Sequence, residues 1–215
     1  TRNTFGGSDY WLIKTDANGT KQWDSVYGGI ADDYCTTIHP VNDGFLLGGN
    51  SLSTISGNKT SNGFGFSDYW LIKINVNGAK QWDITFGGTS DDIFSSIVST
   101  SDGGYILGGH SQSNANGNKT RNSFSFGLRD YWLIKINANG VKQWDSIYGG
   151  TSIDGFNSIV PTNDGGFLLG GYSASNISEN KTSNSFGSND YWIVKIDANG
   201  TKQWDSIYGG TSNDV

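Results

Sequence analysis

Hydrophobic and polar residues alternate along the chain in short runs that are typical of β-strands. The run 69–74 places Trp70 and Ile72 on one face and Tyr69 and Leu71 on the other, because successive side chains of a strand point to opposite faces. A strand that is apolar on both faces must be covered on both. Apolar positions at the helical period of 3.6 are not sustained over ten residues anywhere in the chain, so the sequence predicts an all-β protein.

An Asn-Gly dipeptide after this run predicts a β-hairpin. Asn77 and Gly78 separate it from the alternating run 80–86. Asn-Gly is a strong hairpin signal because a type I′ turn needs positive φ at both central residues. Two further runs, 93–98 and 105–107, end at a Ser-Asp-Gly-Gly turn and at a glycine pair. The predicted unit therefore has four short antiparallel strands.

The same runs return along the chain at intervals of about sixty residues. The sequence Asp-Tyr-Trp begins at four positions, Asp9, Asp68, Asp130 and Asp190. An Asn-Gly-x-Lys-Gln-Trp-Asp block follows each copy, and an Asp-Gly block that ends in Gly-Gly occurs three times. We assign one repeat domain, 1–215, and expect it to be part of a longer array. Its units span 1–59, 60–120, 121–181 and 182–215, the last of which is incomplete.

Four antiparallel strands that are apolar on both faces match the blade of a β-propeller, in which each sheet packs on its neighbours. The predicted fold class is therefore all-β, with four-stranded antiparallel units as propeller blades and a β-solenoid or trefoil-like fold as alternatives. Long connections rich in Asn, Ser and Gly separate the units, and each contains Asn-Lys-Thr. Loops of this length are often functional, so we expect ligand specificity to lie there.

Composition and charge exclude several classes of protein. The 215 residues include 32 Gly, 2 Pro and 8 Trp, with one Cys and a net charge of −6. Gly without a three-residue period excludes collagen, the aromatic content disfavours disorder, and a single Cys excludes a disulfide scaffold. No run approaches the roughly 20 apolar residues that span a bilayer. The acidic balance, with lysines spread evenly over the units, disfavours nucleic acid as a partner.

Catalytic chemistry has little support in the sequence. His39 and His110 occupy non-equivalent positions, and there is no Ser-His-Asp grouping and no zinc-ligand spacing. Cys35 stands where other units have Phe94 and Phe156, so we expect it to be a small buried substitute for Phe. Two carboxylates suffice for a glycosidase, but an active site breaks repeat symmetry and nothing singular does so here. We therefore predict that the chain is not an enzyme; the non-catalytic part of a secreted enzyme is an alternative.

The eight Trp residues fall at two positions of the repeat. We expect the first, within the apolar strand, to fill the space between sheets. The second is flanked by Gln and Asp, and it either packs between sheets or offers its indole face to a sugar. The candidate ligand-binding residues are this Trp and the Asp after it in each unit: Trp23, Trp82, Trp144, Trp204, Asp24, Asp83, Asp145 and Asp205.

Aspartates at turns and before strands are candidates for calcium, whose ligands are oxygen atoms. Asp33, Asp92 and Asp154 precede equivalent strands, which fits a repeated structural bond as well as a repeated metal site. No segment has the alternating acidic spacing of a calcium loop, and Asp commonly opens turns by bonding the backbone two residues on. We predict turn formation, no metal site and no cofactor, with calcium as the open alternative. We also expect the paired lysines of each unit to cap strand ends or to pair with neighbouring Asp.

The succession Asp-Tyr-Trp-Leu-Ile-Lys, Asn-Gly-x-Lys-Gln-Trp-Asp and Asp-Gly-Gly-Phe-Leu-Leu-Gly-Gly resembles propeller-like repeats of large secreted and cell-surface proteins of Bacteroidetes and related bacteria. The resemblance covers essentially the whole chain. It implies a secreted or cell-surface location and a scaffold or adhesin that binds a surface protein or a glycan, together with more repeats of the same chain. The alternative is a lectin-like, carbohydrate-binding module with several equivalent sites, which gains avidity from repetition.

Overall fold

The chain folds into antiparallel β-sheets, and no helix occurs in residues 4–215, the range that the computed structural model describes. The strands are β1 (Tyr10–Thr15), β2 (Lys21–Tyr27), β3 (Asp33–Val41), β4 (Gly44–Ser51), β5 (Asp68–Asn75), β6 (Lys80–Phe86), β7 (Asp92–Ser99), β8 (Tyr105–Ser111), β9 (Asp130–Ile136), β10 (Lys142–Tyr148), β11 (Asp154–Pro161), β12 (Phe167–Ser173), β13 (Asp190–Ile196) and β14 (Lys202–Tyr208).

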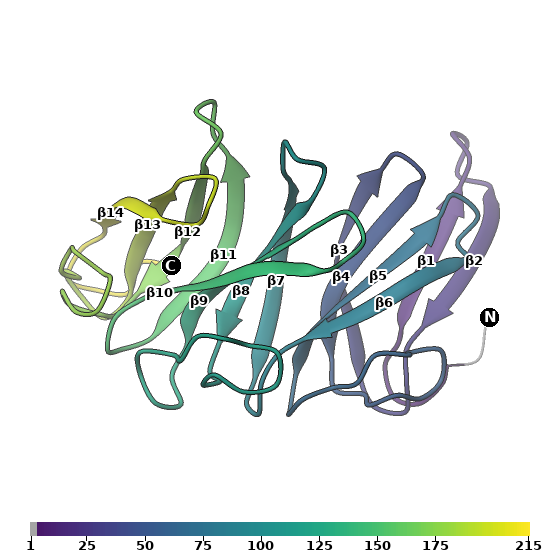
Figure 1. The fold of residues 1–215 in the computed structure, drawn as a ribbon, viewed down its shortest axis with the longest axis horizontal. Helices are drawn as coiled ribbons and strands as arrows, with labels where there is room; N and C mark the ends of the chain where they lie inside the picture. The colour runs from purple at the N-terminus through teal and green to yellow at the C-terminus, as the bar shows by residue number, and fades with distance from the viewer. Residues whose placement is uncertain (1–3) are drawn as a thin grey trace.

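Three complete sheets have four strands each, in chain order: β3–β4–β5–β6, β7–β8–β9–β10 and β11–β12–β13–β14. A two-stranded sheet, β1–β2, precedes them. The predicted all-β fold of repeated four-stranded antiparallel units is confirmed. The sheets follow one another side by side in an open array from β1–β2 to β11–β14, and residues 4–215 do not close into a ring (Figure 1).

The sheets straddle the boundaries of the sequence units. Strand β4 pairs with β5, which lies beyond the long connection 52–67, whereas the short connection 28–32 joins β2 to the next sheet. Each complete sheet therefore combines the second half of one unit with the first half of the next. The two-stranded sheet lies at the N-terminal end, although the sequence repeat has its incomplete unit at the C-terminal end.

The hairpin at Asn77 and Gly78 is confirmed, but its turn is not type I′. A type I′ turn would need a positive φ at both Asn77 and Gly78. Gly78 has φ 76°, but φ is negative at Asn77, because Glu179 is the one non-glycine residue between 4 and 215 with a positive φ. The turn begins earlier, at Asn75, whose carbonyl accepts the Gly78 N–H at 3.0 Å. The Asn75 side chain accepts the N–H groups of Asn77 and Ala79, both at 3.0 Å, and this local bonding selects the longer turn.

Strand β5 is covered on both faces, as predicted. Tyr69 and Leu71 belong to a core cluster that contains Trp132 of the next sheet, whereas Trp70 belongs to a cluster that contains Tyr10 of the preceding sheet. The Tyr69 hydroxyl donates to the Trp132 carbonyl at 3.2 Å, with the two rings 4.9 Å apart. The same pairing joins successive sheets three times: Tyr10 with Trp70, Tyr69 with Trp132 and Tyr131 with Trp192. The first Trp of each complete sheet thus fills the space between sheets, as expected, whereas Trp11 of β1 is 59% exposed and does not follow the expectation.

Cys35 is exposed, so the prediction that it is a buried substitute for Phe is wrong. Phe94 and Phe156 are buried because their rings lie against glycines of the preceding sheet. A Cβ atom on Gly48 would lie 2.5 Å from Phe94 Cζ, and one on Gly108 would lie 2.4 Å from Phe156 Cζ. Cys35 lies in β3, and the sheet before it consists of β1 and β2 alone. Among the described residues, this sheet has no strand equivalent to β4 or β8, whose glycines cover Phe94 and Phe156.

Glu179 has a left-handed backbone, φ 52°, where Gly57 and Gly117 have φ 58° in the equivalent loops. An L side chain in this conformation costs about 1–2 kcal/mol, part of which the greater chain entropy of Gly offsets. We expect Glu179→Gly to raise the free energy of unfolding by about 0.5–1 kcal/mol in urea denaturation. The matched control Gly117→Ala should lower it, because its Cβ would lie 2.4 Å from Gly87 O. An unchanged or lower stability of Glu179→Gly would contradict this account.

Candidate functional site

In the first three units the second Trp lies at the junction with the next sheet. A Cβ atom on Gly78 would lie 2.8 Å from Trp23 Cζ3, so only a glycine leaves room for the ring. The contact occurs in three pairs: Trp23 with Gly78, Trp82 with Gly140 and Trp144 with Gly200. Trp204 meets no such glycine among residues 4–215 and is 46% exposed. Three of the four candidate indole rings therefore pack against the glycine of an Asn-Gly turn.

The Asp after each second Trp is a hydrogen-bond hub. Asp83 Oδ2 accepts Trp70 Nε1–H and the Ser61 N–H, both at 3.0 Å, and Oδ1 accepts Lys80 Nζ at 2.6 Å. Burial alone would raise the pKa of Asp83, but hydrogen bonds from Lys80, Thr60 and Trp70 hold it well below its ordinary value. The Trp–Asp bond recurs at 3.0–3.2 Å in four copies: Trp11 with Asp24, Trp70 with Asp83, Trp132 with Asp145 and Trp192 with Asp205.

The Asn of each Asn-Lys-Thr motif joins its loop to the preceding sheet. Asn58 Oδ1 accepts the Gly28 N–H at 2.9 Å, and Asn58 Nδ2 donates to the Val26 carbonyl at 2.8 Å. The same two bonds are made by Asn118 and Asn180. Sequence reasoning assigned these loops to ligand specificity and missed this role. The signal was the motif itself, which is constant within otherwise variable loops.

The Lys and Thr of the same motif complete the environment of the first Trp. Lys59 is buried and its ammonium lies 4.8 Å from the centroid of the Trp70 ring. Burial lowers the pKa of Lys59 to about 8. The Thr60 N–H donates to Asp83 Oδ2 at 3.0 Å, so one loop motif contacts both the Trp and its Asp. Lys119 and Lys181 lie over Trp132 and Trp192 in the same way.

The Asp residues of the glycine turns form turns, as expected. Asp102 Oδ1 accepts the Gly104 N–H at 3.1 Å, two residues on. The expected pairing of lysines with Asp is also confirmed, and it occurs at these turns in three copies: Lys73 with Asp43, Lys135 with Asp102 and Lys195 with Asp164. Within residues 4–215, no group of three or more His, Cys, Asp or Glu side chains is arranged to hold a metal ion.

A groove opens between the hairpin turns of successive sheets. The groove between β3–β6 and β7–β10, here called the first tip groove, has a volume of 690 Å³. Its lining includes Trp82 and Tyr105, the Lys73–Asp43 ion pair and Asn139. The next groove along the array measures 370 Å³, and its lining includes Asp102, Lys135, Phe167 and Asn199. The first tip groove thus combines aromatic rings with charged and amide groups, and it contains the candidate residue Trp82.

Two buried carboxylates meet at each junction on the opposite edge. Asp68 begins β5 and Asp92 begins β7, and Asp130 and Asp154 form the equivalent pair. The Oδ1 atom of each of these four residues accepts no hydrogen bond from the described residues. Burial, together with the charge of the partner carboxylate, raises the pKa of Asp68 to about 7 and that of Asp130 to about 8. Sequence reasoning noticed Asp92 and Asp154 but not their partners, which come from another sheet.

Comparison of the chain with protein-family models gives no match, and comparison with curated protein sequences gives no significant match. The function is therefore inferred from the geometry of the chain itself. Among residues 4–215 there is no helix with the length and apolar character needed to cross a membrane.

The carboxylate pairs predict that the fold loses stability as pH rises. The pKa values of about 7 and about 8 for Asp68 and Asp130 exceed the ordinary value of 3.8. At these two carboxyls the native state therefore holds more protons than the unfolded chain between about pH 4 and 8, and their contribution to the free energy of unfolding falls across that window as pH rises. We expect a lower Tm at about pH 8.5 than at about pH 5, with a smaller difference in Asp68→Asn/Asp130→Asn.

Asp102→Asn is the control for this pH dependence. Hydrogen bonds from Thr100 and Lys135 lower the pKa of Asp102, so its titration affects stability only below about pH 4. This variant should keep the native slope of Tm against pH in the range from about 5 to 8.5. A native protein with the same Tm at both ends of the range would show that the pairs do not control the slope.

Proposed function

We propose that this chain is a non-catalytic repeat scaffold of an extracellular bacterial protein, which acts as an adhesin by displaying its variable loops to a protein or a cell surface. One observation carries the proposal. The polar and aromatic residues common to all units are engaged in contacts within and between sheets, such as Trp70 with Asp83 and Asn58 with Gly28. The common motifs therefore build the stack, and the residues that differ between units are left for recognition.

The variable residues gather along one edge of the array. The connections 52–67 and 112–129 run along this loop edge, opposite the short hairpin turns (Figure 1). Phe66 and Phe126 project from these two connections, and Phe126 is 93% exposed. Exposed apolar groups with polar neighbours suit protein–protein contact. The resemblance of the repeat to bacterial surface proteins supports the extracellular location, and the repetition of every buried carboxylate supports a non-catalytic role.

The proposal predicts that adhesion depends on the loop edge. Beads coated with the chain should bind one or more of immobilised fibronectin, laminin and collagen, or cultured epithelial cells. Phe66→Ser/Phe126→Ser should reduce binding by about tenfold or more, because it removes two exposed apolar groups from the contact. The control Val141→Ser/Val160→Ser removes exposed apolar groups away from the loop edge and should bind as the native chain does. Binding no greater than that of blank beads would refute the proposal.

The first tip groove favours a second candidate function, carbohydrate binding. Trp82 and Tyr105 offer aromatic surface, while Asn139 and the Lys73–Asp43 pair offer hydrogen-bonding groups within one groove. Sugar sites need this combination because a pyranose has an apolar face and a rim of hydroxyls.

A glycan array separates the two functions. The lectin function predicts a saturable signal that is lost in Trp82→Ala and in Asn139→Ala, with folding checked by urea denaturation. The control Asn199→Ala alters the smaller groove, whose lining residues do not include a Trp, and should retain the signal. A blank array would exclude the sugars tested and leave the scaffold as the better account.

A further inference from the structure

We propose that the chain binds a carboxylate-bearing oligosaccharide, of uronic or sialic acid, in a second groove, here called the arginine groove. The groove has a volume of 580 Å³ and is lined by residues 121–124 of a long connection, residues 146–148 of β10, Asn180, and residues 200–202 between β13 and β14. This volume suits a ligand of about two or three sugar rings. The inference does not depend on adhesion through the loop edge or on sugar binding in the first tip groove.

Arg121 breaks the repeat in the lining of this groove. It stands where the equivalent loops have Ser61 and Ser183. The Ser61 hydroxyl donates to Asp83 Oδ2 at 2.8 Å, and the Ser183 hydroxyl donates in the same way to Asp205. The arginine does not replace this structural bond, because its exposed guanidinium makes no hydrogen bond and no ion pair within residues 4–215. Its charge is therefore available to a ligand.

Three further lining positions carry hydroxyl groups here and apolar side chains at the preceding junction. The residues and their equivalents are Ser146 for Ile84, Tyr148 for Phe86 and Thr201 for Val141. The Tyr148 hydroxyl is used within the fold, since it donates to the Gly200 carbonyl at 2.5 Å. Ser146 and Thr201 thus add hydroxyl groups to the groove that holds Arg121.

Arg121 supplies the positive charge of the groove that is not already paired. Lys202, the other cation in the lining, pairs with Asp205. Burial raises the pKa of Tyr148 and the charge of Arg121 lowers it, so the guanidinium acts on a hydroxyl inside the groove. Asp197, whose charge raises the same pKa, is bound by backbone N–H groups of its own turn. A carboxylate suits this groove because its two oxygens match two N–H groups of a guanidinium.

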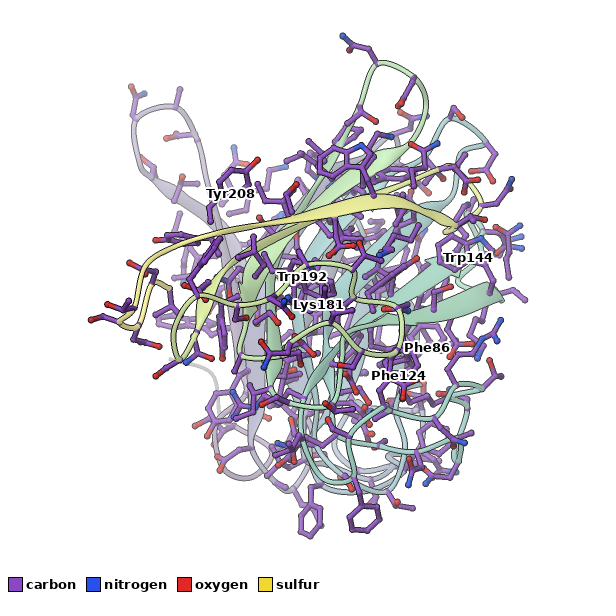
Figure 2. The ribbon with its side chains drawn as sticks, turned by 90° about the vertical axis from the view of Figure 1, so that its left-hand side faces the viewer. Phe86, Phe124, Trp144, Lys181, Trp192 and Tyr208 are labelled. Atoms are coloured by element: carbon purple, nitrogen blue, oxygen red, sulfur yellow. The ribbon has the colours of Figure 1, made fainter. Side chains whose placement is uncertain are left out.

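The remaining lining favours a sugar over an acidic peptide. Strand β10 is at the edge of its sheet, and a peptide can add to such an edge through its backbone. Asn180 closes this edge, because Nδ2 donates to the Ile147 carbonyl at 2.8 Å and Oδ1 accepts the Gly149 N–H at 2.9 Å. Phe124 is partly buried and packs against the core cluster that contains Phe86 (Figure 2). An aromatic ring beside hydroxyl and guanidinium groups matches a sugar, which has an apolar face and a polar rim.

The groove is exposed irrespective of where the sequence ends. It lies between the sheets β7–β10 and β11–β14, both of which are complete. Val141, the equivalent of Thr201, is 58% exposed although the sheet β11–β14 follows its own sheet. A further unit after residue 215 would take the same relative place and would leave this part of the groove open.

Isothermal titration calorimetry with two carboxylated sugars tests the site. The probes are trigalacturonic acid for the uronic acids and 3′-sialyllactose for the sialic acids. We expect saturable binding of at least one of them to the native chain. The uncharged counterparts, methyl-esterified trigalacturonic acid and lactose, should bind about tenfold or more weakly, because they lack the carboxylate that pairs with the guanidinium.

Arg121→Ser is the decisive variant, because it restores the residue of the equivalent loops. Its hydroxyl can donate to Asp145 as Ser61 donates to Asp83, so its free energy of unfolding in urea should not fall below the native value. It should bind the carboxylated sugar about tenfold or more weakly than the native chain does. The control Arg129→Ser removes the same charge from the same connection outside the groove lining and should bind as the native chain does.

Three results would overturn the proposal. The first is that neither carboxylated sugar binds, and the second is that Arg121→Ser binds as tightly as the native chain. The third is that a tetraglutamate peptide binds as tightly as the sugars and loses its binding in Arg121→Ser, which would assign the groove to acidic peptides instead.

Discussion

The stack of sheets depends on the buried Trp of the Asp-Tyr-Trp motif. Trp132 fills the gap between two sheets, where its ring meets Tyr69 and the ammonium of Lys119, and its N–H is bound by Asp145. A ring of this size supplies much of the apolar contact between sheets, but its single polar atom must find an acceptor once water is excluded. The other motifs common to the units are arranged around this requirement.

The polar residues that looked like ligand sites in the sequence are explained by the same requirement. Asp145 binds the indole N–H from its own sheet and also accepts the Thr120 N–H, which anchors the long loop. Asn118 then joins that loop to the preceding sheet. Burial alone would raise the pKa of Asp145, but hydrogen bonds from Thr120 and Trp132 lower it, whereas burial raises the pKa of Asp130 and Asp154. Repeated polar residues thus specify how one sheet sits on the next.

The stacking contact is directional, and this direction gives the array two unlike ends. At each internal junction a Tyr hydroxyl donates to a Trp carbonyl of the next sheet and an indole ring packs on the glycine of its Asn-Gly turn. A second Tyr donates to the carbonyl of that glycine at two of the three junctions, whereas Phe86 takes this place at the other. Tyr208 of the last sheet and Trp11 of the first sheet are exposed, unlike their equivalents at the internal junctions. The long loops and the first tip groove take part in the stack as well. Asn118 joins its loop to the preceding sheet, and Trp82, which lines the groove, packs on Gly140 of the next sheet.

The sequence by itself determined the strands, the hairpins, the repeat and the burial of Trp70 on a two-sided strand, because alternation and turn residues act over a few positions. The tertiary structure decided which strands share a sheet, since β4 reaches β5 across a loop whose length does not reveal the pairing. It also decided the exposure of Cys35 and the pairing of Asp68 with Asp92. These features depend on contacts with residues of a neighbouring sheet, and local sequence patterns do not show which residues those are.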